Sequence, residues 1–146
     1  MMENKQGMSA VVTTLIIILL VIVALGIIWV VVKNVINSGK EQVEWAEKCR
    51  PVEIQAVKIT ETTPGTYDVT LSRTGMGEDD ITGVKLVFGN STDYSSVMPF
   101  GAIPRLETKT EEVVAGIIDA DELQMTAYFT DDLDVEHLCQ TVTKEF

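Results

Sequence analysis

The feature that most constrains this chain is residues 8–32, an uncharged and strongly apolar run of 25 residues that contains no proline. A helix crosses the hydrocarbon core of a bilayer with about 20 residues at about 1.5 Å each, so this apolar segment is long enough to span a membrane. Because it is apolar on every side, it does not fit an amphipathic helix on the surface of a globular domain. We therefore expect a helix surrounded by lipid or by other apolar helices.

Three kinds of N-terminal segment share this character. A secretory signal peptide has an apolar region of about 7–15 residues followed by a small-residue cleavage site. The apolar segment is longer than that, and residues 29–34 (WVVVKN) offer no Ala-x-Ala site. A permanent anchor that tethers an outer domain fits its length and composition. The third alternative is cleavage in front of the segment, after the polar leader of residues 1–7, which ends in Lys5-Gln6-Gly7.

The junction between the leader and the apolar segment resembles the class III signal peptide of the archaeal type IV pilin and archaellin family. The matching residues are Lys5-Gln6-Gly7 and the uninterrupted apolar helix that follows them, about the first quarter of the chain. The resemblance implies that a prepilin peptidase cuts after Gly7 and makes Met8 the first mature residue. Val12 occupies the fifth mature position, where many bacterial pilins carry glutamate, and this favours the archaeal branch. The resemblance also implies that an assembly motor and a membrane platform build a helical homopolymer from such chains.

Residues 33–50 form a more polar neck that continues the helix. Trp29 and Lys33 are typical of the boundary between a membrane and water. The neck carries an apolar stripe among its charges, made of Val35, Ile36, Val43 and Ala46. We expect this stripe to pack against the head or a neighbouring subunit, with a kink or a local loss of helix at Ser38-Gly39, because glycine in a helix interior costs about 1 kcal/mol relative to alanine. Pro51 is expected to end the helix, since the residue before proline is disfavoured in the helical conformation.

From residue 51 onward the hydrophobic period changes to two, which indicates strands. The clearest runs are residues 52–59, 67–71, 84–88 and 123–129, with weaker runs at 94–98, 106–114 and 138–146. Val57 and Ile59 shift the phase of the first run, which predicts a bulge or a change of face. About seven short strands in fewer than 100 residues are typical of a small antiparallel β-sandwich, here immunoglobulin-like. The predicted fold class is therefore α+β, and the resemblance to archaellins and archaeal pilins implies the same head architecture.

The chain has two cysteines, Cys49 at the end of the predicted helix and Cys139 in the last predicted strand. In an exported protein such a pair most often forms a disulfide, which here would join the neck to the final strand. Closing a loop of this length would stabilise the head by roughly 4–5 kcal/mol in the chain-entropy treatment. The alternative is two buried free thiols.

Asn90-Ser91-Thr92 is the single N-x-Ser/Thr sequon in the chain, and it follows the predicted strand at residues 84–88. A surface loop at this position would suit N-glycosylation of Asn90. The alternative is an ordinary turn, because this tripeptide often occurs by chance.

Charge and motif content argue against several functional classes. Residues 51–146 hold six basic and 18 acidic side chains, so the head lacks the Lys and Arg that nucleic-acid binding requires. His137 is the only histidine, which excludes a histidine-rich metal site and favours a surface residue over a catalytic base. Four nearby acids, Asp131, Asp132, Asp134 and Glu136, could bind calcium but lack the EF-hand spacing, which favours a solvated loop. No phosphate-binding loop or nucleophile elbow is present, so we predict no enzyme activity, no cofactor and no metal site.

Together these features predict three parts: the leader (residues 1–7), a long helix (residues 8–50) and a β-sandwich head (residues 51–146). The predicted function is that of a structural subunit of an archaeal type IV pilus-like filament, held in the membrane as a single-pass precursor and later assembled at the cell surface. Residues 8–32 would then form first the membrane span and afterwards the filament core. Two alternatives remain open at this point: an archaellin of a motility filament, and a membrane-anchored extracellular binding or adhesion module that does not polymerise.

Overall fold

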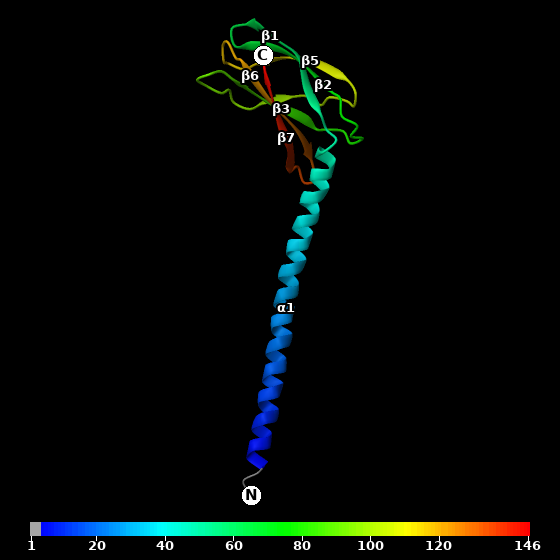
Figure 1. Cartoon of the computed structure of the whole chain (residues 1–146), viewed down its shortest axis with the longest axis vertical. Coiled ribbons are helices and arrows are strands. Elements are labelled where there is room, and N and C mark those ends of the chain that lie inside the picture. Colours follow the sequence, from blue (N-terminus) through cyan, green and yellow to red (C-terminus); the bar gives the residue numbers. More distant parts are fainter. Residues whose placement is uncertain (1–3) are drawn as a thin grey trace. The chain divides into compact units, whose positions relative to one another are not determined.

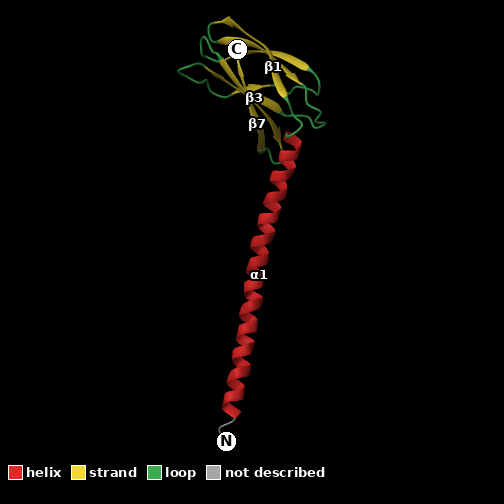
Figure 2. Ribbon diagram, viewed as in Figure 1, coloured by secondary structure: helices red, strands yellow, loops and turns green. Residues whose placement is uncertain are grey.

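The computed structural model describes residues 4–146, with side chains from Ser9 onward. Its first element is one α-helix, α1 (Asn4–Cys49), drawn in red in Figure 2. Lys48 lies in the last turn, where a positive charge is favourable near the helix C-terminus. The chain then turns through a bond from the Val52 N–H to the Cys49 carbonyl at 3.0 Å, so the predicted end of the helix before Pro51 is confirmed.

Of the two alternatives expected at Ser38-Gly39, the local loss of helix is wrong, because α1 runs through both residues without interruption, and the kink stays a prediction. One interior glycine costs only about 1 kcal/mol. A break would create two new helix ends, each with several backbone groups lacking an intrahelical partner. The continuous helix is therefore the less costly arrangement.

The chain divides into two compact units between Val43 and Glu44, and the second unit, Glu44–Phe146, contains all seven strands. These are β1 (Ile54–Thr63), β2 (Thr66–Arg73), β3 (Gly83–Gly89), β4 (Met98–Phe100), β5 (Thr108–Val114), β6 (Glu122–Thr130) and β7 (Glu136–Glu145), labelled in Figure 1 where space allows. They form two antiparallel sheets, one in the order β1-β2-β5 and the other in the order β4-β3-β6-β7. The predicted α+β class, with a long helix followed by a two-sheet antiparallel head, is confirmed.

The core of the head follows from alternation along three central strands. In β2, β3 and β6 every second side chain is buried, and the outward positions are polar or partly exposed. The buried set from these strands is Tyr67, Val69, Leu71, Val84, Leu86, Phe88, Leu123, Met125, Ala127 and Phe129. Alternation of period two places these residues on the inner faces of the two sheets, where burying each large side chain contributes about 1.5–3 kcal/mol.

The structure confirms the predicted bulge in the first strand and corrects the position of one weaker strand. The register of β1 against β2 shifts between Ala56 and Lys58, which confirms the predicted bulge beside Val57. The predicted strand at residues 94–98 is wrong in position: Tyr94 makes only an isolated bridge to Gly89, and β4 begins at Met98. The side chain of Ser95 explains why β4 does not begin before Met98.

Ser95 replaces part of the sheet pairing with its own side chain. Its hydroxyl accepts a hydrogen bond from the Phe88 N–H at 2.9 Å and donates one to the Ser96 carbonyl at 2.9 Å. Such local side-chain bonds compete with strand ladders. The backbone around Ser95 therefore lies beside β3 without extending β4.

Two polar side chains in the core tie loops to the sheets. The Tyr67 hydroxyl donates to the Ile117 carbonyl and accepts from the Ala120 N–H, both at 2.9 Å. Burial raises the pKa of Tyr67, and the hydrogen bond from Ala120 opposes this only in part. Both bonds are therefore made by a neutral phenol.

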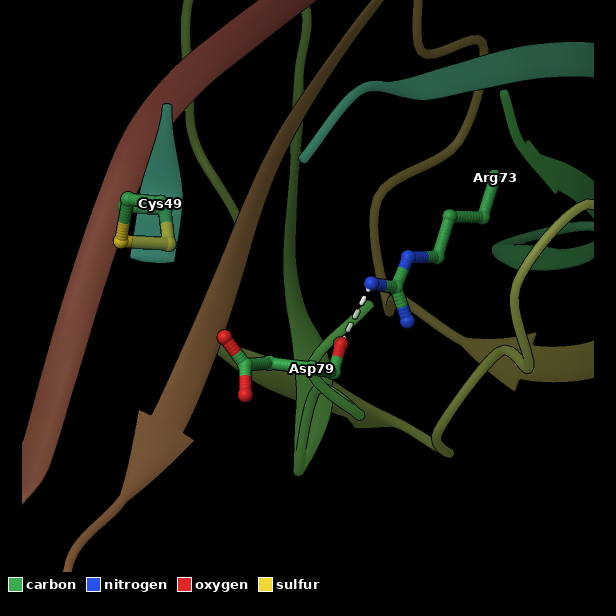
Figure 3. Close-up of a disulfide and its surroundings, with 4 residues drawn as sticks. Cys49, Arg73 and Asp79 are labelled. Carbon is green, nitrogen blue, oxygen red and sulfur yellow. Dashed lines mark hydrogen bonds between the residues drawn. A yellow bond between two sulfur atoms is a disulfide. The ribbon is translucent and has the colours of Figure 1, made fainter. Parts of the chain in front are cut away.

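Arg73 is fully buried at the end of β2 and has no carboxylate partner in the described part of the chain. Its guanidinium donates to the backbone carbonyls of Gly77 at 3.2 Å, Asp79 at 2.5 Å and Ile103 at 3.5 Å. Figure 3 shows the bond to Asp79, whose carboxylate points away from the guanidinium. Arg73 therefore holds two loops against the sheets through their main chains.

Candidate functional site

The first candidate site is the surface of the apolar segment. Every large apolar side chain from Val11 to Val32 is 44–69 % exposed, so none is covered by another part of the chain. The most apolar 18-residue window of α1 has a mean hydropathy of 3.5 and contains no buried residue. α1 is thus long and apolar enough to cross a membrane, as the sequence predicted. A surface of this size and composition is stable only against lipid or against other apolar helices.

Two of the three side-chain hydroxyl groups of the apolar segment bond to the helix backbone. The hydroxyl of Thr13 donates to the Ser9 carbonyl, and that of Thr14 donates to the Ala10 carbonyl, each at 2.8 Å. Serine and threonine commonly bond to the carbonyl one turn earlier when a helix lies in an apolar environment. The segment therefore needs no water or protein partner for these hydroxyls.

The predicted peptidase site falls within the helical backbone. Gly7 and Met8 both belong to α1, but the side chain of Met8 lies outside the described residues. Cleavage between them stays a prediction.

The neck is exposed where the apolar stripe was expected to pack. Val35, Ile36 and Val43 are 66 %, 51 % and 60 % exposed. Packing of this stripe against the head or against a neighbouring subunit stays a prediction.

The last turn of α1 is built into the head. Cys49 and Cys139 form a disulfide with a Cα–Cα distance of 5.2 Å and a sequence separation of 90 residues, as expected (Figure 3). Trp45 lies one turn earlier on the same face of the helix and stacks on His137, with ring centroids 4.1 Å apart and planes 9° apart. Lys48 places its Nζ 4.4 Å from the centre of the Trp45 ring. A covalent bond and an aromatic contact thus hold the helix end to β7.

His137 is not the free surface residue that the sequence suggested. Its Nε2 lies 3.0 Å from Oδ2 of Asp131, and both side chains are about one quarter exposed. The other carboxylate oxygen of Asp131 accepts the N–H groups of Leu133 and Val135 at 2.8 and 2.9 Å. The hydrogen bond from His137, followed by the one from Val135, lowers the pKa of Asp131. This acid therefore closes the β6–β7 loop and aligns the histidine that stacks on Trp45.

The sequence alone did not identify Trp45 as a contact residue. The available signal was its spacing, because Trp45 precedes Cys49 by four residues and shares its face on a helix. A disulfide at Cys49 therefore requires Trp45 to face the same strand. His137 precedes Cys139 by two residues, which places both on one side of β7.

The sequon at Asn90 forms a compact turn. The Asn90 side-chain carbonyl accepts from the Thr92 N–H, the Thr92 hydroxyl and the Asp93 N–H at 2.8–3.0 Å. Its amide nitrogen donates to the Ile118 carbonyl at 3.4 Å, a long bond on the exposed edge of the head. Asn90 also lines an open hollow of about 560 Å³ beside Tyr94 and Phe146. A sugar joined to the amide nitrogen would need only this one weak bond to be replaced, and glycosylation stays a prediction.

Among the described residues, no group of three or more His, Cys, Asp or Glu is placed to hold a metal ion. Of the four acids in the calcium alternative, Asp131 bonds to the loop backbone, Asp134 has a positive φ of 59°, and Glu136 pairs with Lys85 on β3. What the described residues do present is an apolar helix surface and a head linked to the end of that helix by a disulfide. No protein-family model matches the chain, and no curated protein matches it either.

Proposed function

We propose that this chain is a structural subunit of a type IV pilus-like surface filament of the archaeal kind, which polymerises through its apolar segment. The observation that carries the proposal is the helix α1, whose residues 9–32 expose apolar side chains on every side and are followed by a small disulfide-linked head. In a filament, a bundle of identical apolar helices would cover these exposed side chains.

The same segment suits both stages of such a life cycle. In the precursor, residues 9–32 lie in lipid as a single span. In the filament they exchange lipid contacts for side-chain packing against other copies, with little change in exposure to water. The internal bonds of Thr13 and Thr14 remain intact in both environments, so the transfer breaks no polar contact in the helix.

The composition and the disulfide of the head support a location outside the cell. Disulfides form and persist in oxidising compartments. The excess of acidic over basic residues in the head favours solubility, and sugar on Asn90 would add to it. In this proposal the heads coat the filament, and a separate assembly motor and membrane platform do the mechanical work.

The proposal is tested by identifying the N-terminal residue of the surface-exposed chain. Mass spectrometry of material sheared from cells should find a chain that begins at Met8, and electron microscopy of the same material should show filaments that disappear when the gene is deleted. The variant Gly7→Val should leave the leader attached and the chain in the membrane. Gly26→Ala is the control for cleavage alone, because Gly26 lies in α1 far from the Gly7–Met8 bond, and this variant should still begin at Met8. Surface chains that still begin at Met1 or Met2 would overturn the proposal.

A second candidate is a membrane-anchored extracellular binding module. The same apolar helix supports a permanent anchor, and the open hollow beside Asn90, Tyr94 and Phe146 is a place where a ligand could lie. An intact leader on the surface form, together with the absence of filaments, would favour this module.

A further inference from the structure

The neck carries one positive side chain that has no oppositely charged neighbour on its own helix. Residues three and four positions apart are the neighbours on a helix surface. For Lys33 these neighbours are uncharged: Trp29, Val30, Ile36 and Asn37. Lys33 is exposed and takes part in no ion pair among residues 9–146. It is also the first charge after the apolar segment.

The neck also carries one negative side chain that has no oppositely charged neighbour on its own helix. The helical neighbours of Glu41 are Asn37, Ser38, Glu44 and Trp45, none of which is basic. Glu41 is exposed and takes part in no ion pair in the described part of the chain. Both unmatched charges lie within the first compact unit, which ends at Val43.

Each of the remaining charges of the neck has an oppositely charged residue three or four positions away in the sequence. Lys40, Glu44 and Lys48 follow one another at intervals of four, and Glu44 and Lys48 form an ion pair at 3.6 Å. Glu47 and Arg50 are three positions apart. Lys33 and Glu41 are therefore left over, one of each sign, eight residues apart.

The two environments of the proposed life cycle treat Lys33 differently. While the apolar segment is in lipid, the ammonium group of Lys33 can reach phosphate head groups and water at the membrane surface. After assembly its surroundings are other helices, and a charge that loses water without gaining a partner is costly. Its own helix supplies no carboxylate within reach, whereas another copy of the same helix can supply one.

We propose that Lys33 of one subunit pairs with Glu41 of the next, which fixes an axial stagger of about eight residues, or about 12 Å, between neighbouring helices. The inference rests on the proposed filament function. All copies enter the membrane in the same orientation, so neighbouring helices are parallel. Packing in register would set Lys33 beside Lys33 and Glu41 beside Glu41, and like charges at close range repel. The stagger replaces the two repulsive contacts by one attractive contact between each pair of neighbouring helices.

The test is a charge exchange in the full-length chain, read as filament mass sheared from equal numbers of cells. Lys33→Glu and Glu41→Lys should each lower the yield about tenfold, because each replaces an attraction by a repulsion at every subunit contact. The double variant K33E/E41K should restore the yield to within about threefold of the parent, since the pair is re-formed with the signs exchanged. Lys58→Glu is the control for net charge, because Lys58 is an exposed residue of β1 outside any ion pair among the described residues. It should leave the yield unchanged.

Folding and insertion are measured separately. The amount of precursor in the membrane and the presence of the Cys49–Cys139 disulfide should be equal in all variants. Glu41→Lys protects the test from an insertion defect, because Glu41 lies nine residues beyond the apolar segment.

The outcomes separate this inference from the proposed function. If the parent chain gives no filaments, the proposed function fails. If the parent gives filaments but the single variants assemble as well as the parent, or the double variant assembles no better than the single ones, the pairing of Lys33 with Glu41 is overturned while the filament proposal stands.

Discussion

Removing the disulfide between Cys49 and Cys139 should cost the head about 4–5 kcal/mol of unfolding free energy. The two cysteines are 90 residues apart, and the entropy that a cross-link removes from the unfolded chain grows with the logarithm of the loop it closes. For a loop of this length the chain-entropy treatment gives about 4.6 kcal/mol at 25 °C. With a typical urea dependence of about 1.5 kcal/mol per M, the unfolding midpoint should fall by roughly 3 M.

The measurement is urea unfolding of the full-length chain in detergent micelles, followed by tryptophan fluorescence. The chain has two tryptophans, Trp29 and Trp45, so the substitution Trp29→Phe leaves Trp45 as the only reporter. Trp45 stacks on His137 in the folded head and should change its emission when the head unfolds. The variant C49A/C139A is compared with the parent in this background.

Two controls define the result. Reductant should lower the midpoint of the parent and leave the cysteine-free variant unchanged. Trp45 emission without urea should be the same in both, because the contact with His137 does not need the covalent bond. Equal midpoints for the two chains, with equal urea dependence, would refute the reasoning, since they would show that the link does not restrict the unfolded chain.

The other predictions concern the interior and one loop of the head, and the same unfolding assay checks them. Gly65→Ala should cost about 1–2 kcal/mol, because Gly65 has a φ of 79° and a Cβ would lie 3.3 Å from Cα of Gly116; an unchanged midpoint would contradict this. Arg73→Met should cost about 2–4 kcal/mol, since three backbone carbonyls lose their donor, and a stabilised variant would show that the cost of burying the charge dominates. The hydrogen bond from His137 lowers the pKa of Asp131 in the folded state, so the stability it contributes is complete above about pH 4 and is lost as the pH falls below the unfolded pKa toward the folded one. Asp131→Asn should flatten that acidic limb, and a profile identical to the parent's would contradict the assignment.

The parts of the fold that sequence could predict are those determined by local pattern. The alternation in β2, β3 and β6 reports burial directly, because one face of each sheet must exclude water. Pro51 ends α1 through its own steric requirement, and the phase shift at Val57 marks the bulge for the same local reason. The cysteines joined as expected because a chain with two of them has one way to form a disulfide within itself.

The parts that sequence missed depend on contacts between distant residues. Ser95 displaced the predicted strand because its hydroxyl found the backbone of β3, a contact that the local pattern does not contain. Arg73 continues the inward alternation of β2, and the period therefore pointed to a buried position, but the carbonyls that receive it come from two separate loops. The helix continues through Gly39 because the cooperative stability of the surrounding helix exceeds the local cost of one glycine.

The location of the disulfide gives the end of α1 two attachments to the head. The main chain leads from Cys49 through Pro51 into β1, which belongs to the sheet β1-β2-β5. The disulfide leads from the same residue to Cys139 on β7, which belongs to the other sheet. In the proposed filament, force applied along the helix during assembly would reach Cys49 through the backbone hydrogen bonds of α1 and then divide between the two sheets. With the main chain alone, the same force would act on β1, an edge strand, and would peel it from β2 one hydrogen bond at a time. If the helix is pulled during assembly, a covalent link at the last helical residue helps the head to stay folded.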